Sequence, residues 1–290
     1  MQKHSAYGLI SGLSAAAIWG AMYVVSKAVM ETIPPFTLIT SRLLLGIGVL
    51  YIVLLMRGGI KLSNRSFWKV FGVGTIGYGV SLGFQFVGTK LSTASNGSLV
   101  TSATPAFVLL FAAIILGEKI TARRIFALAL ATFGVIAVID PRTAQLEPGL
   151  FLGNISLVLA AITWALYSVL IRKVTREVDV LTTSMVAFIG GLVISVPLSI
   201  FEINHTGIGE ITVPIIAGIL FLGVIATALS MFLWNTAFAE LPAGVASLTF
   251  FAQPVVGTIL GAFFLGDTIT PMFIVGGVLI GLGIVISAKE

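Results

Sequence analysis

Long apolar runs, separated by short breaks rich in charged residues, glycine or proline, repeat along the whole 290-residue chain. Each run approaches or exceeds the roughly 20 residues that a helix needs to cross a bilayer, and is too long for the roughly 10-residue strands of a membrane β-barrel. Only 9% of the residues are charged, against about a quarter in soluble domains. We therefore expect an all-α membrane protein with ten transmembrane helices, at 7–29, 35–56, 67–89, 93–116, 122–140, 150–172, 180–201, 212–238, 242–265 and 270–288.

The 16 lysines and arginines lie mostly on one side of this predicted topology. With the N-terminus inside, 12 of them fall on the cytoplasmic side, Lys27, Lys90 and Arg142 fall on the outer side, and Arg42 lies within a span. The positive-inside rule then places both termini in the cytoplasm and the protein in the cell (inner) membrane. Because the basic excess sets the topology, the net charge of +5 predicts no nucleic-acid partner.

The two halves of the sequence resemble each other. The stretch that ends in Trp19 returns in the stretch that ends in Trp164, and each tryptophan is followed eight residues later by a basic residue. We expect two repeats of five helices, 1–147 and 148–290, and an odd number of helices makes the second repeat enter the membrane from the opposite face. Inverted repeats around a central cavity are typical of transporters that open one site alternately to either side.

A second pair of motifs makes the resemblance specific. Pro105 with Leu-Gly-Glu-Lys-Ile-Thr at 116–121 corresponds to Pro254 with Leu-Gly-Asp-Thr-Ile-Thr at 265–270. With the paired repeats and early tryptophans, the chain resembles EamA-type members of the drug/metabolite transporter (DMT) superfamily. The resemblance implies a central cavity that moves amino acids or similar metabolites, often outward. Other metabolites, such as nucleobases, sugars or drugs, stay open as alternatives, as do a lipid flippase and a structural membrane protein.

Pro105 and Pro254 lie near the middle of their predicted spans. Proline lacks an N–H and clashes with the carbonyl four residues before it, so each proline is predicted to interrupt its helix and to act as a hinge. At membrane depth a freed carbonyl is tolerated only against protein or a wet cavity. The alternative is a kink that only aids packing. The residues before the prolines, Thr104 and Gln253, suit hydrogen bonds to a ligand.

Aromatic and polar side chains within other spans are further candidates for a substrate site. Trp19 and Tyr23 lie one turn apart on the first helix, and Trp164 and Tyr167 repeat this pattern on the sixth. In a pocket such rings would stack on an organic substrate; alternatively, each is a packed core residue with its own hydrogen-bond partner. The predicted substrate-binding residues are Trp19, Tyr23, Arg42, Gln85, Asn96, Thr101, Thr104, Trp164, Tyr167, Trp234, Asn235 and Gln253.

Arg42 lies about seven residues into its span, roughly 10 Å deep at 1.5 Å per residue. A charge within the membrane indicates function by default, and a guanidinium can bind a substrate carboxylate through two hydrogen bonds. The alternatives are that Arg42 snorkels to the outer surface or binds carbonyls of a neighbouring helix. Glu118 and Asp267 are interpreted as turn residues, with Thr121 and Thr270 as N-caps of the helices that follow.

The sequence argues against an enzyme, and predicts no cofactor and no metal. It has no cysteine, both histidines lie in a terminus or a loop, and every acidic residue lies at a break or terminus. A nucleophile with its base, or a metal site, is therefore not expected within a span. The absence of a proton-carrying side chain in the spans predicts facilitative transport, as uniport or exchange. Helices 122–140 and 270–288 are expected to face lipid or a second copy of the chain in a homodimer.

Overall fold

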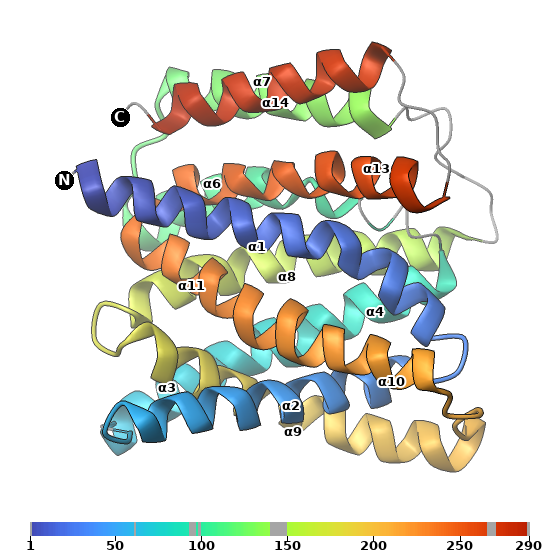
Figure 1. Ribbon diagram of the computed structural model, residues 1–290. Coiled ribbons are helices and arrows are strands. Elements are labelled where there is room, and N and C mark those ends of the chain that lie inside the picture. Colours follow the sequence, from blue (N-terminus) through green and yellow to red (C-terminus); the bar gives the residue numbers. More distant parts are fainter. Residues whose placement is uncertain are drawn as a thin grey trace.

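The computed structural model describes residues 2–60, 62–92, 97, 100–139, 150–265 and 271–288, which form helices and connections without a strand (Figure 1). The elements of the first half are α1 (Gln2–Val29), α2 (Pro35–Met56), α3 (Asn64–Gly74), η1 (Thr75–Ser81), α4 (Leu82–Leu91), α6 (Thr104–Leu116) and α7 (Ala122–Ile139). Those of the second half are α8 (Phe151–Val174), α9 (Val180–Thr206), α10 (Val213–Leu220), η4 (Phe221–Leu229), α11 (Ser230–Glu240), α12 (Ala243–Leu248), η5 (Thr249–Phe251), α13 (Ala252–Leu265) and α14 (Pro271–Ala288).

Many described helix ends lie within two residues of the predicted spans, because local chemistry sets them, whereas α1 begins five residues earlier and α9 ends five residues later than predicted. Pro35 is the first residue of α2, where a missing N–H is harmless. Asp179 precedes α9 and accepts a hydrogen bond from Thr182 N at 2.9 Å. Thr121 precedes α7 and accepts from Arg124 N at 3.2 Å, which confirms its predicted role as an N-cap.

Four predicted spans are not single α-helices in the described residues, and the fourth of them, 93–116, is interrupted by a turn at Ser102 and Ala103 before α6. The third span of the first half is α3, the π-helical segment η1 and α4, and the third span of the second half is α10, the π-helical segment η4 and α11. The ninth predicted span divides into α12, the short 3₁₀ segment η5 and α13. The apolar pattern gave no signal for the two π-helical segments, whereas Pro254 predicted the interruption of the ninth span. Insertions of π geometry are uncommon in helices and occur often at functional sites.

Six described helical segments are long and apolar enough to cross a membrane: Ala6–Val29, Pro35–Met56, Asn64–Leu91, Phe151–Val174, Val180–Thr206 and Val213–Glu240. Large apolar side chains are exposed on these helices and on α7 and α14, among them Met56, Leu152 and Val213. A water-facing surface rarely carries so much contiguous apolar area. The chain is therefore an all-α, multi-pass membrane protein.

The helices pack mainly between the two halves of the sequence. α1 contacts α11 and α13, whereas α8 contacts α4 and α6. α2 packs on α9, and α7 packs on α14 as a pair at the top of Figure 1. α1 begins and α14 ends at the same end of the bundle, on the left in that view.

Two glycines let α3, η1 and α9 meet backbone to backbone. A methyl group on Gly74 would lie 2.1 Å from Ala187 O, and one on Gly190 would lie 2.1 Å from Phe71 O. Both distances are far inside van der Waals contact, so no larger residue fits without moving a helix. This close approach holds the η1 segment against the second half of the chain.

Candidate functional site

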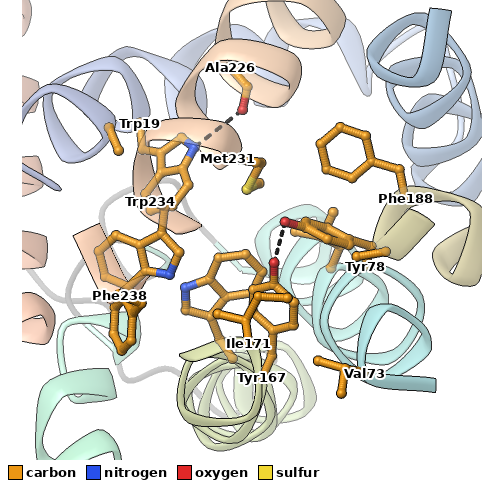
Figure 2. Packing of buried hydrophobic residues seen from close by; sticks show 14 of the residues in the cluster. Trp19, Val73, Tyr78, Tyr167, Ile171, Phe188, Ala226, Met231, Trp234 and Phe238 are labelled. Atoms are coloured by element: carbon orange, nitrogen blue, oxygen red, sulfur yellow. Dashed lines mark hydrogen bonds between the residues drawn. The ribbon is translucent and has the colours of Figure 1, made fainter. Parts of the chain in front are cut away.

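Three tryptophans from different helices form the centre of the bundle. The ring centroid of Trp19 on α1 lies 5.8 Å from that of Trp164 on α8 and 5.2 Å from that of Trp234 on α11. Phe250 in η5 completes the cluster, 6.0 Å from Trp19 and 5.6 Å from Trp234. Figure 2 shows Trp19 beside Trp234, with the Trp19 indole nitrogen directed at Ala226 O. Rings at such distances attract each other beyond the apolar area that they bury.

A small cavity adjoins this cluster. The space open to the centres of water molecules is about 20 Å³, enough for about one water molecule. Its walls come from both halves of the chain and mix aromatic, methionine and uncharged polar side chains. The lining residues are Trp19, Met22, Ser81, Leu82, Gln85, Thr101, Thr104, Ala160, Ala161, Trp164, Met231, Phe250 and Gln253. Six of the predicted substrate-binding residues therefore meet around one cavity.

Three of the lining residues carry buried polar atoms without a hydrogen-bond partner in the described part of the chain. They are Thr104 Oγ1, Trp164 Nε1 and Gln253 Nε2. Thr104 is 0%, Gln253 1% and Trp164 7% exposed. Leaving a buried donor unpaired costs about 1–3 kcal/mol each. A ligand or water that accepts hydrogen bonds in the cavity would remove this penalty.

The remaining polar groups beside the cavity are already paired. Gln85 Nε2 donates to Tyr23 Oη at 2.7 Å, and Tyr23 Oη lies 2.8 Å from Thr101 Oγ1. Thr101 Oγ1 in turn donates to Gly97 O at 2.6 Å. Because Thr101 uses its proton on Gly97, the Tyr23 hydroxyl is the donor to Thr101. Tyr23 thus holds Gln85 and Thr101 in place and is not among the residues that line the cavity.

Arg42 is fully buried, which contradicts the alternative that it snorkels to the outer surface. Its Nε donates to Thr227 Oγ1 at 2.9 Å and its Nη2 to Ala226 O at 3.4 Å, both in the π-helical segment η4. The guanidinium lies 4.8 Å from the centre of the Phe86 ring. Nη1 has no partner, and no described carboxylate pairs with the side chain. Arg42 thus binds a neighbouring helix, which is the second alternative that the sequence left open.

Arg42 does not line the cavity, because Met22 lies between them. Arg42 Nη2 lies 3.5 Å from Met22 Sδ, and Met22 is one of the lining residues. The charge of Arg42 is therefore held one side chain away from the site.

Within the π-helical segment η4, the carbonyl oxygen of Ala226 accepts hydrogen bonds from three donors. Ala226 O accepts from Arg42, from Trp19 Nε1 at 3.2 Å and from Ser230 Oγ at 2.6 Å.

Tyr167 and Asn235 belong to a second polar cluster and not to the cavity lining. Tyr167 Oη donates to Asn235 Oδ1 at 2.8 Å and lies 2.5 Å from Tyr78 Oη (Figure 2), while Asn235 Nδ2 donates to Ser184 Oγ at 2.9 Å. Trp234 Nε1 donates to Ser168 Oγ at 3.1 Å. The three predicted residues here, Tyr167, Trp234 and Asn235, thus have hydrogen-bond partners inside the protein, as the packing alternative predicts. Sequence reasoning missed Tyr78, whose aromatic ring within a glycine-rich stretch was the available signal.

Both predicted hinge prolines lie just after an interruption of their helix. Pro105 is at the start of α6, after a turn at Ser102 and Ala103. Pro254 is the third residue of α13, directly after the 3₁₀ segment η5. The chain thus changes helical geometry next to Thr104 and Gln253, where the unpaired polar atoms lie. Asn96, also predicted to bind substrate, is outside the described residues, as are Asp267 and Thr270.

Glu118 lies in the connection between α6 and α7, as its interpretation as a turn residue predicts, and it also contacts the second half of the chain. Its Oε1 accepts from Ala243 N at 2.8 Å, and its Oε2 lies 3.4 Å from Gly244 N, at the start of α12. Arg124 Nη1 lies 3.2 Å from Oε2, and Arg172 Nε lies 3.3 Å from Oε1. One carboxylate from the first half therefore joins helix ends of both halves.

Arg172 and its counterpart Lys27 bind helix ends in the same way. Arg172 Nη1 donates to Phe238 O and to Leu241 O at the end of α11. Lys27 Nζ donates to three carbonyls at the end of α4, with distances of 2.9 to 3.2 Å. Each base follows its tryptophan by eight residues. The two ends of the bundle thus carry matching contacts.

The fold defines a multi-pass α-helical membrane protein with a small cavity among helices from both halves of the chain, and none of the described residues that line this cavity is charged. The sequence matches the EamA-like transporter family over residues 6–139 and again over residues 151–288, and the chain belongs to this family.

The similar proteins include several uncharacterized transporters of bacteria and archaea. The uncharacterized transporter YyaM of Bacillus subtilis is 27% identical over 98% of this chain and 93% of its own length. An uncharacterized transporter of Archaeoglobus fulgidus is 26% identical over 94% of this chain and 95% of its own. A protein of Salmonella typhimurium named as a probable amino-acid metabolite efflux pump is 25% identical over 95% of this chain and 92% of its own.

A crystal structure of another protein shares the fold. The two superpose with a TM-score of 0.81 at 19% sequence identity, over 98% of this chain and 99% of that chain. At this identity the likeness establishes the fold alone.

Proposed function

We propose that this protein moves a small organic metabolite, in the first place an amino acid, out of the cell through the central cavity. This proposal rests mainly on three buried donors that have no hydrogen-bond partner among the described residues. They belong to Thr104, Trp164 and Gln253, and they surround a cavity lined by both halves of the chain. The protein acts by alternating access, in the inner membrane and with both termini in the cytoplasm. Its partner is the transported small molecule, and the protein needs no cofactor for transport.

The chemistry of the walls supports a substrate with two different ends. An N–H, an amide NH₂ and a hydroxyl can donate to the oxygens of a carboxylate or carbonyl group. The tryptophan faces and the two methionines, Met22 and Met231, suit an apolar side chain. None of the described lining residues is charged, which disfavours a cation and fits an overall neutral zwitterion. The Salmonella relative carries a name of the same substrate class.

The contacts between helices support two inverted halves of five helices each, 1–147 and 148–290. If α1 to α7 correspond in order to α8 to α14, the contact of α1 with α11 matches that of α8 with α4. The contact of α2 with η4 likewise matches that of α9 with η1, and the pairs α2–α9 and α7–α14 match themselves. Two such halves can exchange conformations. The cavity of about 20 Å³ then belongs to a closed form.

The distribution of carboxylates supports facilitative transport, by uniport or exchange. No acidic side chain is among the described residues that line the cavity. Coupling to protons generally requires a group that gains and loses a proton within the membrane. The substrate's own gradient therefore drives export when the cell overproduces it.

The experiment is counterflow of labelled amino acids into proteoliposomes that contain the purified full-length protein. We expect saturable exchange for at least one amino acid, with no accumulation driven by an imposed pH or Na⁺ gradient. Trp164→Phe removes the unpaired N–H and keeps a ring. Because a hydrogen bond to a charged acceptor contributes about 1.5–3 kcal/mol, KM should rise about ten- to hundredfold.

Trp68→Phe is the matched control, because Trp68 is 58% exposed on α3 and outside the cavity. Its KM should stay at the wild-type value. If Trp164→Phe and Trp68→Phe had the same KM, the unpaired donors would not bind substrate. Folded wild-type protein that exchanged no amino acid would contradict the proposed substrate class.

A further inference from the structure

A second, strongly basic pocket lies where the connections of the two halves meet. It has a volume of about 280 Å³ and is lined by Glu118 together with four cationic residues, Lys119, Arg124, Arg172 and Arg176. Four positive charges against one negative charge leave a net charge of +3. This pocket is separate from the central cavity, with which it shares no lining residue.

The carboxylate of Glu118 does not engage all four cations. It pairs with Arg124 and Arg172, whose side chains are only 10% and 17% exposed. Lys119 and Arg176 are exposed, and neither side chain forms an ion pair or hydrogen bond with a described residue. Like charges held this close repel one another. An anion in the pocket would relieve that repulsion and supply the missing acceptors.

The position of the basic pocket indicates which kind of anion it binds. Its lining residues lie at the end of α8, at the start of α7 and in the connections before α7 and α12, which is the depth of lipid headgroups for membrane-spanning helices. Ile120, beside Lys119, is 46% exposed and offers apolar surface next to the pocket. Arginine binds phosphate oxygens through paired hydrogen bonds, and basic pockets between helix ends recognise anionic headgroups.

We propose that this pocket binds the phosphate group of an anionic phospholipid. Arg124 and Arg172, already fixed by Glu118, form its floor, and Lys119 and Arg176 close over the phosphate from the exposed side. The site is independent of substrate transport, so its test needs no transport activity. Free inorganic phosphate shares the same chemistry and is the second source of ligand that the experiment distinguishes.

The test is calorimetric titration of the full-length protein, in an uncharged detergent, with a short-chain phosphatidylglycerol. Phosphatidylcholine of the same chain length and inorganic phosphate are titrated in parallel. The variant Lys119→Gln/Arg176→Gln removes two cations that take no part in the contacts of Glu118, so the fold is preserved. At about 1 kcal/mol for each basic residue, phosphatidylglycerol should bind this variant about 30-fold more weakly.

Arg57→Gln/Arg65→Gln is the matched control, because it removes the same charge from exposed residues outside the pocket. Its affinity should equal that of the wild type. Inorganic phosphate that bound as tightly as the lipid, with the same loss in the first variant, would support a phosphate site and assign it to the free ion. Equal weakening by both double variants, or none by either, would overturn the proposal, as would phosphatidylcholine binding as tightly as phosphatidylglycerol.

Discussion

Replacing Glu118 with glutamine keeps the size of the side chain and removes the one negative charge among the described residues that line the basic pocket. Breaking a buried ion pair on one side costs about 3–5 kcal/mol, and breaking an exposed one costs about 0–1 kcal/mol. Glu118 is 14% exposed, and the amide can still accept from Ala243 N. We therefore expect a loss of about 2 kcal/mol in the free energy of unfolding, between these two limits.

Equilibrium unfolding in mixed micelles measures this loss, and the unfolding constant should rise about 30-fold. Glu177→Gln is the matched control: the same substitution in the exposed pair of Glu177 with Lys69, whose side chains are 54% and 41% exposed. Its effect should be much smaller. Because Glu118 holds the start of α12, a cysteine placed at the buried Ser247 should also react faster with a thiol reagent in Glu118→Gln.

The natural chain has no cysteine, so such a labelling experiment has no background. Equal stability losses for Glu118→Gln and Glu177→Gln would refute the argument that burial makes the contacts of Glu118 important. An unchanged labelling rate at position 247, with the expected loss of stability, would show that Glu118 does not control access to α12.

Two further predictions test packing and charge. Gly74→Ala places a methyl group 2.1 Å from Ala187 O and should destabilise the fold by about 3 kcal/mol or more. The control Gly72→Ala has nothing within 4 Å of the new atom, so it should be neutral or stabilise the fold by up to about 1 kcal/mol. Equal unfolding midpoints for the two variants would refute the close contact at Gly74. Lys69 donates to Glu177 at 2.7 Å and holds the pKa of the Glu177 carboxyl below its usual value of 4.5, so the ion pair is present above that value and is lost as the pH falls through the lowered pKa. A carboxyl-carbon NMR titration should show this pKa rise in Lys69→Gln, and an unchanged pKa would remove Lys69 as its cause.

The membrane class, the helix positions and the family could all be predicted from the sequence. The length of an apolar run and the residues at its ends are local properties, and they decide where a membrane helix starts and stops. The ends of α2 and α7, and the cap at Thr121, followed from this rule. The paired motifs around Pro105 and Pro254 were enough to indicate the family, which the match over both halves confirmed.

The candidate site was predicted only in part, because being polar within a span does not say which partner a residue has. Trp19, Thr104 and Gln253 line the cavity, whereas Tyr167 and Asn235, chosen by the same reasoning, bind each other in a separate cluster. The π-helical segments were also unpredicted, since the apolar pattern is the same in α and π geometry. They are nevertheless what directs Ala226 O at Arg42 and Trp19.

Tertiary structure decided whether each polar group is buried and which hydrogen-bond partner it has. Arg42 meets Thr227 across 185 positions of sequence, and Glu118 meets Ala243 across 125. Whether such groups are paired, buried or free to bind a ligand depends on distances of a few ångströms between helices that are remote in sequence. Hydropathy and spacing fix the helices one at a time, but an unpaired donor or an excess of charge is a property of several helices together. Thr104, Trp164 and Gln253 meet around one cavity only because their helices pack together in the folded chain.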